Sequence, residues 1–166
     1  MVFCGEGGSI YRSSRALVDE IDSTEPTADS VEELFDLLEG TRPDPMLIAH
    51  VGGRYADLTR HREGLERAVE VHSAWGTFEW IVEDAFRMGY RVGIVANSDG
   101  HKGRPGASYP GAGWFGAIGG LTCFLMPELT RAALLECLRR RRHYATTGGL
   151  NGRVFLDFRV IFEWQT

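Results

Sequence analysis

Histidine and aspartate side chains close several apolar runs of this chain. The run "MLIAH" ends at His50, "AVEVHS" carries His72 near its end, and "VGIVANSDGH" ends in Asp99 and His101. Imidazole nitrogens and carboxylate oxygens are ligands for zinc, manganese and iron, and an i, i+2 pair such as Asp99 and His101 points to one side of an extended segment. One such histidine is more often a packed or turn residue, but these run ends taken together predict a divalent-metal site.

Glu70 stands two residues before His72, so both side chains lie on the same side of an extended segment. Glu70 is a candidate metal ligand, or a carboxylate that orients His72 through a hydrogen bond. An ion pair with a neighbouring arginine explains it equally well. The predicted metal ligands are therefore His50, Glu70, His72, Asp99 and His101, with zinc, manganese or iron as the expected ion.

Basic residues flank these candidates at Arg54, Lys102 and Arg104. Each is suited to hold a phosphate or carboxylate group, arginine through two parallel hydrogen bonds, although a solvated loop accounts for them as well. We expect Asp99, His101 and Arg104 to carry catalysis. The expected substrate is a small molecule that bears a phosphate or a carboxylate.

Other polar features have plainer explanations. His61 lies in the polar stretch "HREG" and is expected to be exposed, and His143 is expected to have a structural role at a helix end. The segment "GAGWFG", 111–116, satisfies GxGxxG but lacks the preceding strand and following helix of a dinucleotide site. The basic run Arg139–Arg142 falls at the end of a predicted helix, where cations complement the helix dipole.

The elements that must position the candidates follow from apolar periodicity. Ser30 and Glu33 form a capping box before a helical pattern that Gly40 ends, and Thr130 is a predicted N-cap. Strands separated by helices indicate an α/β architecture with a mostly parallel sheet, in which ligands collect at the carboxyl ends of the strands. We expect helices over 30–40, 77–89 and 129–141, strands over 46–50, 68–73, 91–99 and 119–126, and strand structure within 153–164.

Composition indicates one soluble domain over residues 1–166. The chain is 43% hydrophobic, and its formal charge of −5 without a long basic stripe argues against nucleic acid as a partner. No apolar segment is long enough to span a bilayer and the first residues lack the order of a signal peptide, so we expect no membrane partner and a cytoplasmic location. Cys4, Cys123 and Cys137 are an odd number of cysteines without CxxC spacing, and they are expected to be buried thiols.

Four segments together resemble the carboxyl-terminal portion of PHP-type metal-dependent hydrolases, and more narrowly the bacterial DUF3604 subgroup. They are "LIAHVGGRYADL", "AVEVHSAWGTFEW", "VGIVANSDGHKGRPGASYPG" and "GGLTCFLMPELTRAALLECLRRRRHYATTGG". The resemblance extends over nearly the whole chain, roughly 5–159, and "SDGHKGRPG" and "YATTG" are its most specific parts.

The resemblance implies part of a distorted (βα)7 TIM-like barrel with two or three metal ions at its carboxyl mouth. It implies His50, His72, Asp99 and His101 as ligands, and a phosphoesterase that uses metal-activated water. The family's HxH pair and other early ligands have no counterpart before His50. The resemblance therefore also implies a fragment or partial gene product.

Two functions compete on this basis. The first is a metal-dependent hydrolase, and the second is a catalytically inactive or incomplete PHP-like fragment that serves as a metal-binding or interaction module. An incomplete barrel exposes strand edges, so the isolated chain is expected to self-associate.

Overall fold

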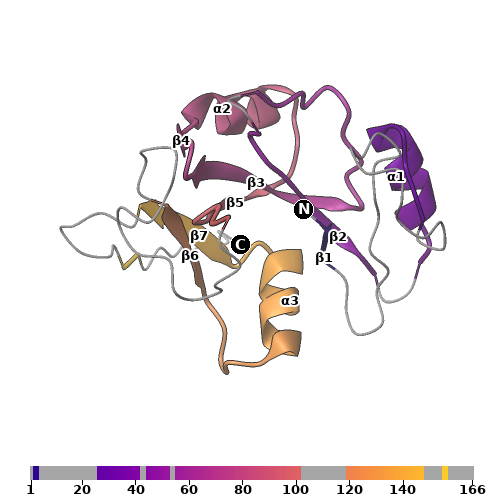
Figure 1. The fold of residues 1–166 in the computed structure, drawn as a ribbon. Helices are drawn as coiled ribbons and strands as arrows, with labels where there is room; N and C mark the ends of the chain where they lie inside the picture. Colours follow the sequence, from indigo (N-terminus) through magenta and orange to yellow (C-terminus); the bar gives the residue numbers. More distant parts are fainter. Residues whose placement is uncertain are drawn as a thin grey trace, which may run out of the picture.

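The computed structural model describes residues 2–3, 26–41, 44–52, 55–101, 119–147 and 155–156. Figure 1 shows two sheets with helices on different sides of the larger one. The elements, in chain order, are β1 (Val2–Phe3), α1 (Val31–Leu38), β2 (Met46–Ala49), β3 (Glu66–Ser73), β4 (Gly76–Thr77), α2 (Glu79–Arg87), β5 (Gly93–Ala96), β6 (Gly120–Phe124), α3 (Arg131–Arg139) and β7 (His143–Thr147).

The centre of the larger sheet is a parallel trio, with β3 between β2 and β5. Ala49 pairs with Val69, and His72 pairs with Ala96, so the carboxyl ends of these strands lie side by side. β1 joins the outer side of β2 in antiparallel direction. β4 folds back antiparallel onto the last residues of β3, where Thr77 pairs with His72.

The expected (βα)7 TIM-like barrel of mostly parallel strands is wrong. Only two of the five strand pairings among the described residues are parallel, and these strands form no closed barrel. β6 does not extend the parallel ladder from β5; it pairs instead with β7 in an antiparallel two-stranded sheet. A barrel requires each new strand to continue one staggered ladder, and here the ladder stops at β5.

A side chain joins the two sheets where the backbone ladder stops. The Thr122 hydroxyl accepts from Ala96 N at 3.1 Å and donates to Ala96 O at 2.8 Å. Gly120 N donates to Asn97 O at 2.8 Å just beyond it. The edge of β5 is thereby satisfied without a regular strand partner, which a buried backbone requires.

Side-chain caps mark the starts of α1 and α3, and a glycine follows the end of α1. Ser30 Oγ accepts from Glu33 N at 3.1 Å, and Glu33 accepts in return from Asp29 N at 2.7 Å, so the predicted capping box is present one residue displaced. Thr130 caps α3 through Ala133 N. Gly40 follows α1 with a left-handed φ of 78°, as expected for a glycine that ends a helix. Phe35 and Leu38 form the buried face of α1, while Val31 and Leu37 are exposed.

Successive side chains of β3 point to opposite faces of the larger sheet, and a different helix packs on each face. Val69 packs with Ile81 and Ala85 of α2, whereas Ala68 packs with Leu138 of α3. Figure 1 accordingly shows α2 and α3 on opposite sides of β3, with α1 beside the start of β2 and β3. Met46 and Ile48 of β2 therefore face the α3 side together with Ala68, and Phe124 of β6 packs on the same side.

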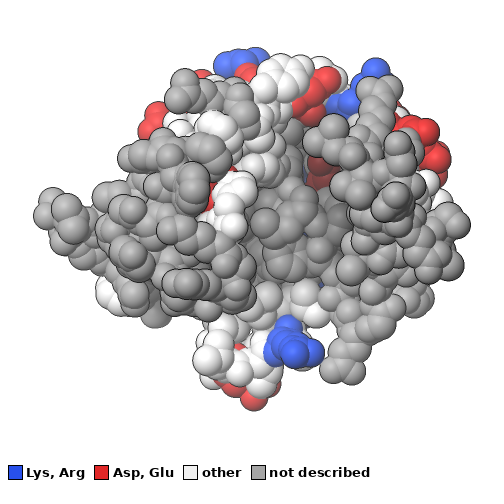
Figure 2. Space-filling model, viewed as in Figure 1, with Lys and Arg blue, Asp and Glu red and all other residues white. Residues whose placement is uncertain are grey.

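Charged side chains on α1 are paired with the loop that precedes β3. Arg60 contacts Glu32 at 2.6 Å, and Arg62 contacts Asp36 at 2.8 Å and Glu39 at 2.7 Å. Figure 2 shows basic and acidic groups interspersed along the edge formed by α1 and α2. Within the described part of the chain, no helix is both long and apolar enough to cross a membrane.

Candidate functional site

Polar side chains gather at the carboxyl ends of β2, β3 and β5. His50 follows the last residue of β2, Glu70 lies on β3, and Asn97 follows the last residue of β5. The register places them side by side, because Ala49 pairs with Val69 and Glu70 lies beside β5. The predicted convergence of polar residues at adjacent strand ends is thus present in the sheet, although the sheet is not the expected barrel.

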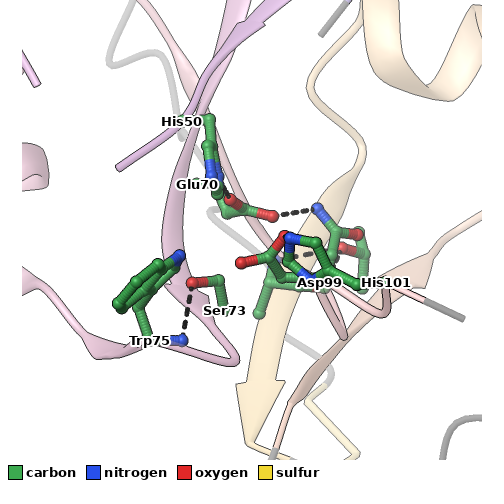
Figure 3. A network of polar contacts seen from close by, with 9 residues as sticks. His50, Glu70, Ser73, Trp75, Asp99 and His101 are labelled. Carbon is green, nitrogen blue, oxygen red and sulfur yellow. Dashed lines mark hydrogen bonds and ion pairs between the residues drawn. The ribbon is translucent and has the colours of Figure 1, made fainter. Parts of the chain in front are cut away.

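Glu70 is the centre of a hydrogen-bonded chain across these strands (Figure 3). Its side chain is 3% exposed, and its Oε2 accepts from His50 Nδ1. Its Oε1 accepts from Asn97 Nδ2 at 2.7 Å. Both carboxylate oxygens are therefore engaged, and Glu70 orients His50 rather than the His72 considered from the sequence.

Asp99 and His101 lie beside this chain, and Figure 3 shows them next to Glu70. The distance from Asp99 Oδ1 to His101 Nε2 is 4.0 Å, which is too long for a hydrogen bond. Asp99 has a left-handed φ of 48°, a conformation that aspartate and asparagine adopt more readily than most residues. Its Oδ2 is buried and has no hydrogen-bond partner among the described residues.

His72 follows Glu70 by two residues on β3, but the strand register shifts between them, and His72 has a different environment. Its Nδ1 is 2.6 Å from Thr77 Oγ1 on β4. β6 approaches it so closely that a Cβ on Gly120 would lie 2.9 Å from His72 Cδ2 and 2.5 Å from Ala96 Cβ. Glycine at position 120 therefore lets β6 pack against this end of β3 and β5.

Ser73 and Trp75 border the site on the β3–β4 turn. Ser73 Oγ accepts from Trp75 N at 3.2 Å, and Figure 3 shows the indole to one side of the Asp99 carboxylate. Ser73 is buried and Trp75 is half-buried. The aromatic ring contributes an apolar border to a site that is otherwise polar.

These residues suit a divalent ion in chemical type. Among the described residues, however, no three His, Cys, Asp or Glu side chains are gathered closely enough to hold one. A buried carboxylate oxygen without a partner, such as Asp99 Oδ2, is unfavourable unless a cation or a donor satisfies it. With Nδ1 directed at Glu70, His50 has Nε2 left as a ligand atom, which is how carboxylates commonly orient metal-binding histidines. The donors fit a metal chemically, and binding one requires side-chain movement.

The remaining predictions concern residues outside this cluster or outside the described part of the chain. Arg54, Lys102 and Arg104 are outside the described residues. His61, expected to be exposed, has a side chain only 10% exposed, because it stacks on Tyr90 with ring centroids 3.9 Å apart and bonds Glu66 at 2.7 Å.

A cavity of about 270 Å³ lies at the opposite, amino-terminal ends of β2 and β3. Its lining includes Arg62, Arg67 and Arg139 together with Glu39 and Asp44. The cavity is therefore separate from the histidine and carboxylate cluster.

Sequence reasoning missed Asn97 and Thr77. Asn97 was visible only as a polar residue at the end of "VGIVAN", and its role depends on the register that brings it beside Glu70. Thr77 is brought to His72 by the β4 turn. Neither contact is encoded by a short spacing that could be recognised in the sequence.

No family model, curated protein or solved structure matches the chain. The function is therefore inferred from the chemistry of the site itself.

Proposed function

We propose that the chain is a divalent-metal-dependent hydrolase that acts on a small phosphoester. The observation that carries the proposal is the buried, unpartnered Oδ2 of Asp99, beside His101 and at the same strand ends as an oriented His50. Carboxylate and imidazole at one sheet edge are the donor types that zinc, manganese and iron use in hydrolases. The resemblance of "SDGHKGRPG" to PHP-type hydrolases points to the same chemistry.

In this proposal His50, Asp99 and His101 hold the metal, and Glu70 fixes the His50 ring. His72 is a further candidate donor, although its Nδ1 is engaged by Thr77. When bound, a divalent ion would lower the pKa of its bound water and stabilise negative charge on a phosphoryl oxygen. Asp99 would engage the metal through Oδ2, and its other oxygen, Oδ1, would then receive a proton from the nucleophilic water.

The proposed substrate is a small phosphoester, and its phosphate group carries the negative charge that the protein must bind. Arg104, which lies outside the described residues, is proposed to hold that group through a bidentate contact. Trp75 borders the site and is proposed to pack against an apolar part of the substrate.

The test is calorimetric titration of the metal-free chain with Zn²⁺ and with Mn²⁺, followed by assay against a chromogenic phosphomonoester and phosphodiester. Wild-type protein should bind metal stoichiometrically. Asp99→Asn is a suitable variant because asparagine tolerates the left-handed φ of 48° and leaves the shape unchanged. It should weaken metal binding at least tenfold, in line with the cost of disturbing a metal's immediate surroundings.

Asp57→Asn is the matched control, since it makes the same chemical change on an exposed loop where Asp57 accepts from Thr59 N at 2.9 Å. Metal binding by Asp57→Asn should equal that of the wild type. Equal binding by Asp99→Asn would contradict the site. Binding without hydrolysis of either ester would contradict the phosphoesterase.

A non-catalytic interaction module is the second candidate. It is favoured because these side chains already hydrogen-bond one another. Both carboxylate oxygens of Glu70 accept hydrogen bonds, and His72 Nδ1 is bonded to Thr77. In that case the cluster ties the strand ends together and has no metal to hold. Failure of both metals to bind wild-type protein would select this candidate.

A further inference from the structure

Three arginines lie at the amino-terminal ends of neighbouring elements, far along the strands from the histidine cluster. Arg67 is the second residue of β3, and Arg91 and Arg141 each stand two residues before β5 and β7. The β3–β5 register aligns Ala68 with Gly93. Gly93 in turn lies against Arg141, because a Cβ built on Gly93 would be 3.4 Å from Arg141 Cβ. The fold therefore brings these arginines to one edge of the sheet.

Arg141 is held in place by its backbone and its side chain. Its φ of 56° is left-handed, which is unusual for a residue other than glycine and turns the chain sharply out of α3. Its Nε donates to Arg91 O at 2.7 Å. Among the described residues no acceptor takes its remaining guanidinium N–H groups, which are left to bind a ligand.

This cluster of Arg67, Arg91 and Arg141 is poorly compensated by acidic groups. Burial lowers the pKa of Arg141, and the charges of Arg67 and Arg91 lower it further, while Glu63 alone acts in the opposite direction. Arg62, Arg87 and Arg140, in contrast, each contact a carboxylate. Like charges held together without such partners repel one another until an anion binds.

We propose that Arg67, Arg91 and Arg141 form a binding site for a phosphate group at the amino-terminal edge of the sheet. Planar guanidinium groups match the oxygens of phosphate in pairs and are weakly hydrated, so they favour phosphate over a monovalent anion. Arg67 also lines the cavity of about 270 Å³, which gives room for the rest of a small phosphorylated ligand. This site is independent of the proposed metal site at the other ends of the same strands.

The experiment measures thermal unfolding of the whole chain in excess chelator, with sodium phosphate or pyrophosphate against sodium chloride of equal ionic strength. The phosphate anions should raise the midpoint in a saturable way, by roughly 3 to 6 °C at ten times the Kd. Chloride should give a smaller rise that does not saturate. A phosphate effect equal to that of chloride would overturn the proposal.

Single substitutions test whether phosphate binds at these three arginines. Arg91→Gln should weaken phosphate binding at least fivefold while the protein stays folded, because the Arg91 side chain is exposed and the Arg141 contact uses its backbone oxygen. Arg67→Gln should act in the same direction. Arg87→Gln, which removes an arginine paired with Asp84 on α2, should leave binding unchanged.

Asp99→Asn should also bind phosphate like the wild type, which separates this site from the metal site. Unchanged phosphate binding in both Arg67→Gln and Arg91→Gln would overturn the assignment. Loss of binding in Asp99→Asn would overturn it as well, because the anion would then lie at the other end of the strands.

Discussion

At the scale of single residues, Asn97 is the group that fixes the acidic centre of the site. Its amide donates to Glu70 Oε1, its backbone N donates to His72 O at 3.0 Å, and its backbone O accepts from Gly120 N. Asn97 thus bonds β3 with both its side chain and its backbone N–H, and its backbone carbonyl bonds the first residue of β6. The amide matters because a carboxylate in its place would face the carboxylate of Glu70.

Asn97→Asp should therefore be more destabilising than Asn97→Ala. Loss of the donor in Asn97→Ala is expected to cost roughly 1 kcal/mol of unfolding free energy, and an opposing charge should add about 1 to 2 kcal/mol. Urea denaturation at pH 7 measures both. The gap should narrow as the pH falls, because protonation of one of the two facing carboxyls removes the repulsion, and a gap that stays constant with pH would contradict the explanation.

The predicted residues of the site differ in how far local sequence determines them. His50 and Asp99 were proposed as ligands because they follow apolar runs, and the end of such a run marks the end of a buried strand. His61 was assigned to the surface because its neighbours are polar, but its partner Tyr90 lies 29 positions along the chain. Contacts of this kind depend on tertiary packing, which the pattern around one residue does not contain.

At the scale of elements, the hydroxyl of Thr122 connects the two sheets. It meets both the N–H and the C=O of Ala96, so its removal leaves two backbone groups without partners. Thr122→Val retains the shape and should cost about 1 to 3 kcal/mol. Thr122→Ser retains the hydroxyl and should cost less than Thr122→Val, as measured by chemical denaturation; the reverse order would show that packing of the methyl group dominates.

The helices were predictable because their signals are local. Ser30 with Glu33 and Thr130 mark starts, and Gly40 and Gly89 mark ends, each glycine with a left-handed φ of 78° or 79°. β7 was not predicted, because "HYATT" has no clear apolar alternation and becomes a strand by pairing with β6. β1 and β4 have two residues each and are defined entirely by their partners.

At the scale of the whole molecule, the second sheet packs on the first through His143. This residue is buried against Gly93, whose added Cβ would lie 2.4 Å from His143 Nε2, and that nitrogen has no partner among the described residues. Burial lowers the pKa of His143, and Arg141 lowers it further, while its contact with Cys137 O acts against this. The folded protein therefore holds His143 neutral where the unfolded chain would protonate it.

The lowered pKa of His143 makes the free energy of unfolding depend on pH. Below about pH 6.5, the ordinary pKa of histidine, the unfolded state binds more protons at this residue than the folded state, so the His143 contribution lowers stability as pH falls. His143→Gln should lose less stability than the wild type between pH 7 and pH 5. Equal slopes for His143→Gln and wild type would contradict this origin.

The architecture could be predicted only in part. The parallel trio of β2, β3 and β5 follows from apolar runs separated by turns and by α2, and the site follows from their common carboxyl ends. The prediction of a barrel was wrong because the pattern of "GGLTCFLM" indicates a buried strand but contains no information about the direction of that strand or its neighbour in the sheet. β6 pairs with β7 instead, and the paired residues are 19 to 27 positions apart in the sequence.

The chain of bonds from His50 through Glu70 to Asn97 has a consequence for local opening. Strand ends usually fray independently, and their amides exchange with solvent faster than those at strand centres. Here three strand ends are fastened to one carboxylate. Amide hydrogens near the ends of β2, β3 and β5 should therefore exchange together as one cooperative unit, and Glu70→Gln should release all three at once.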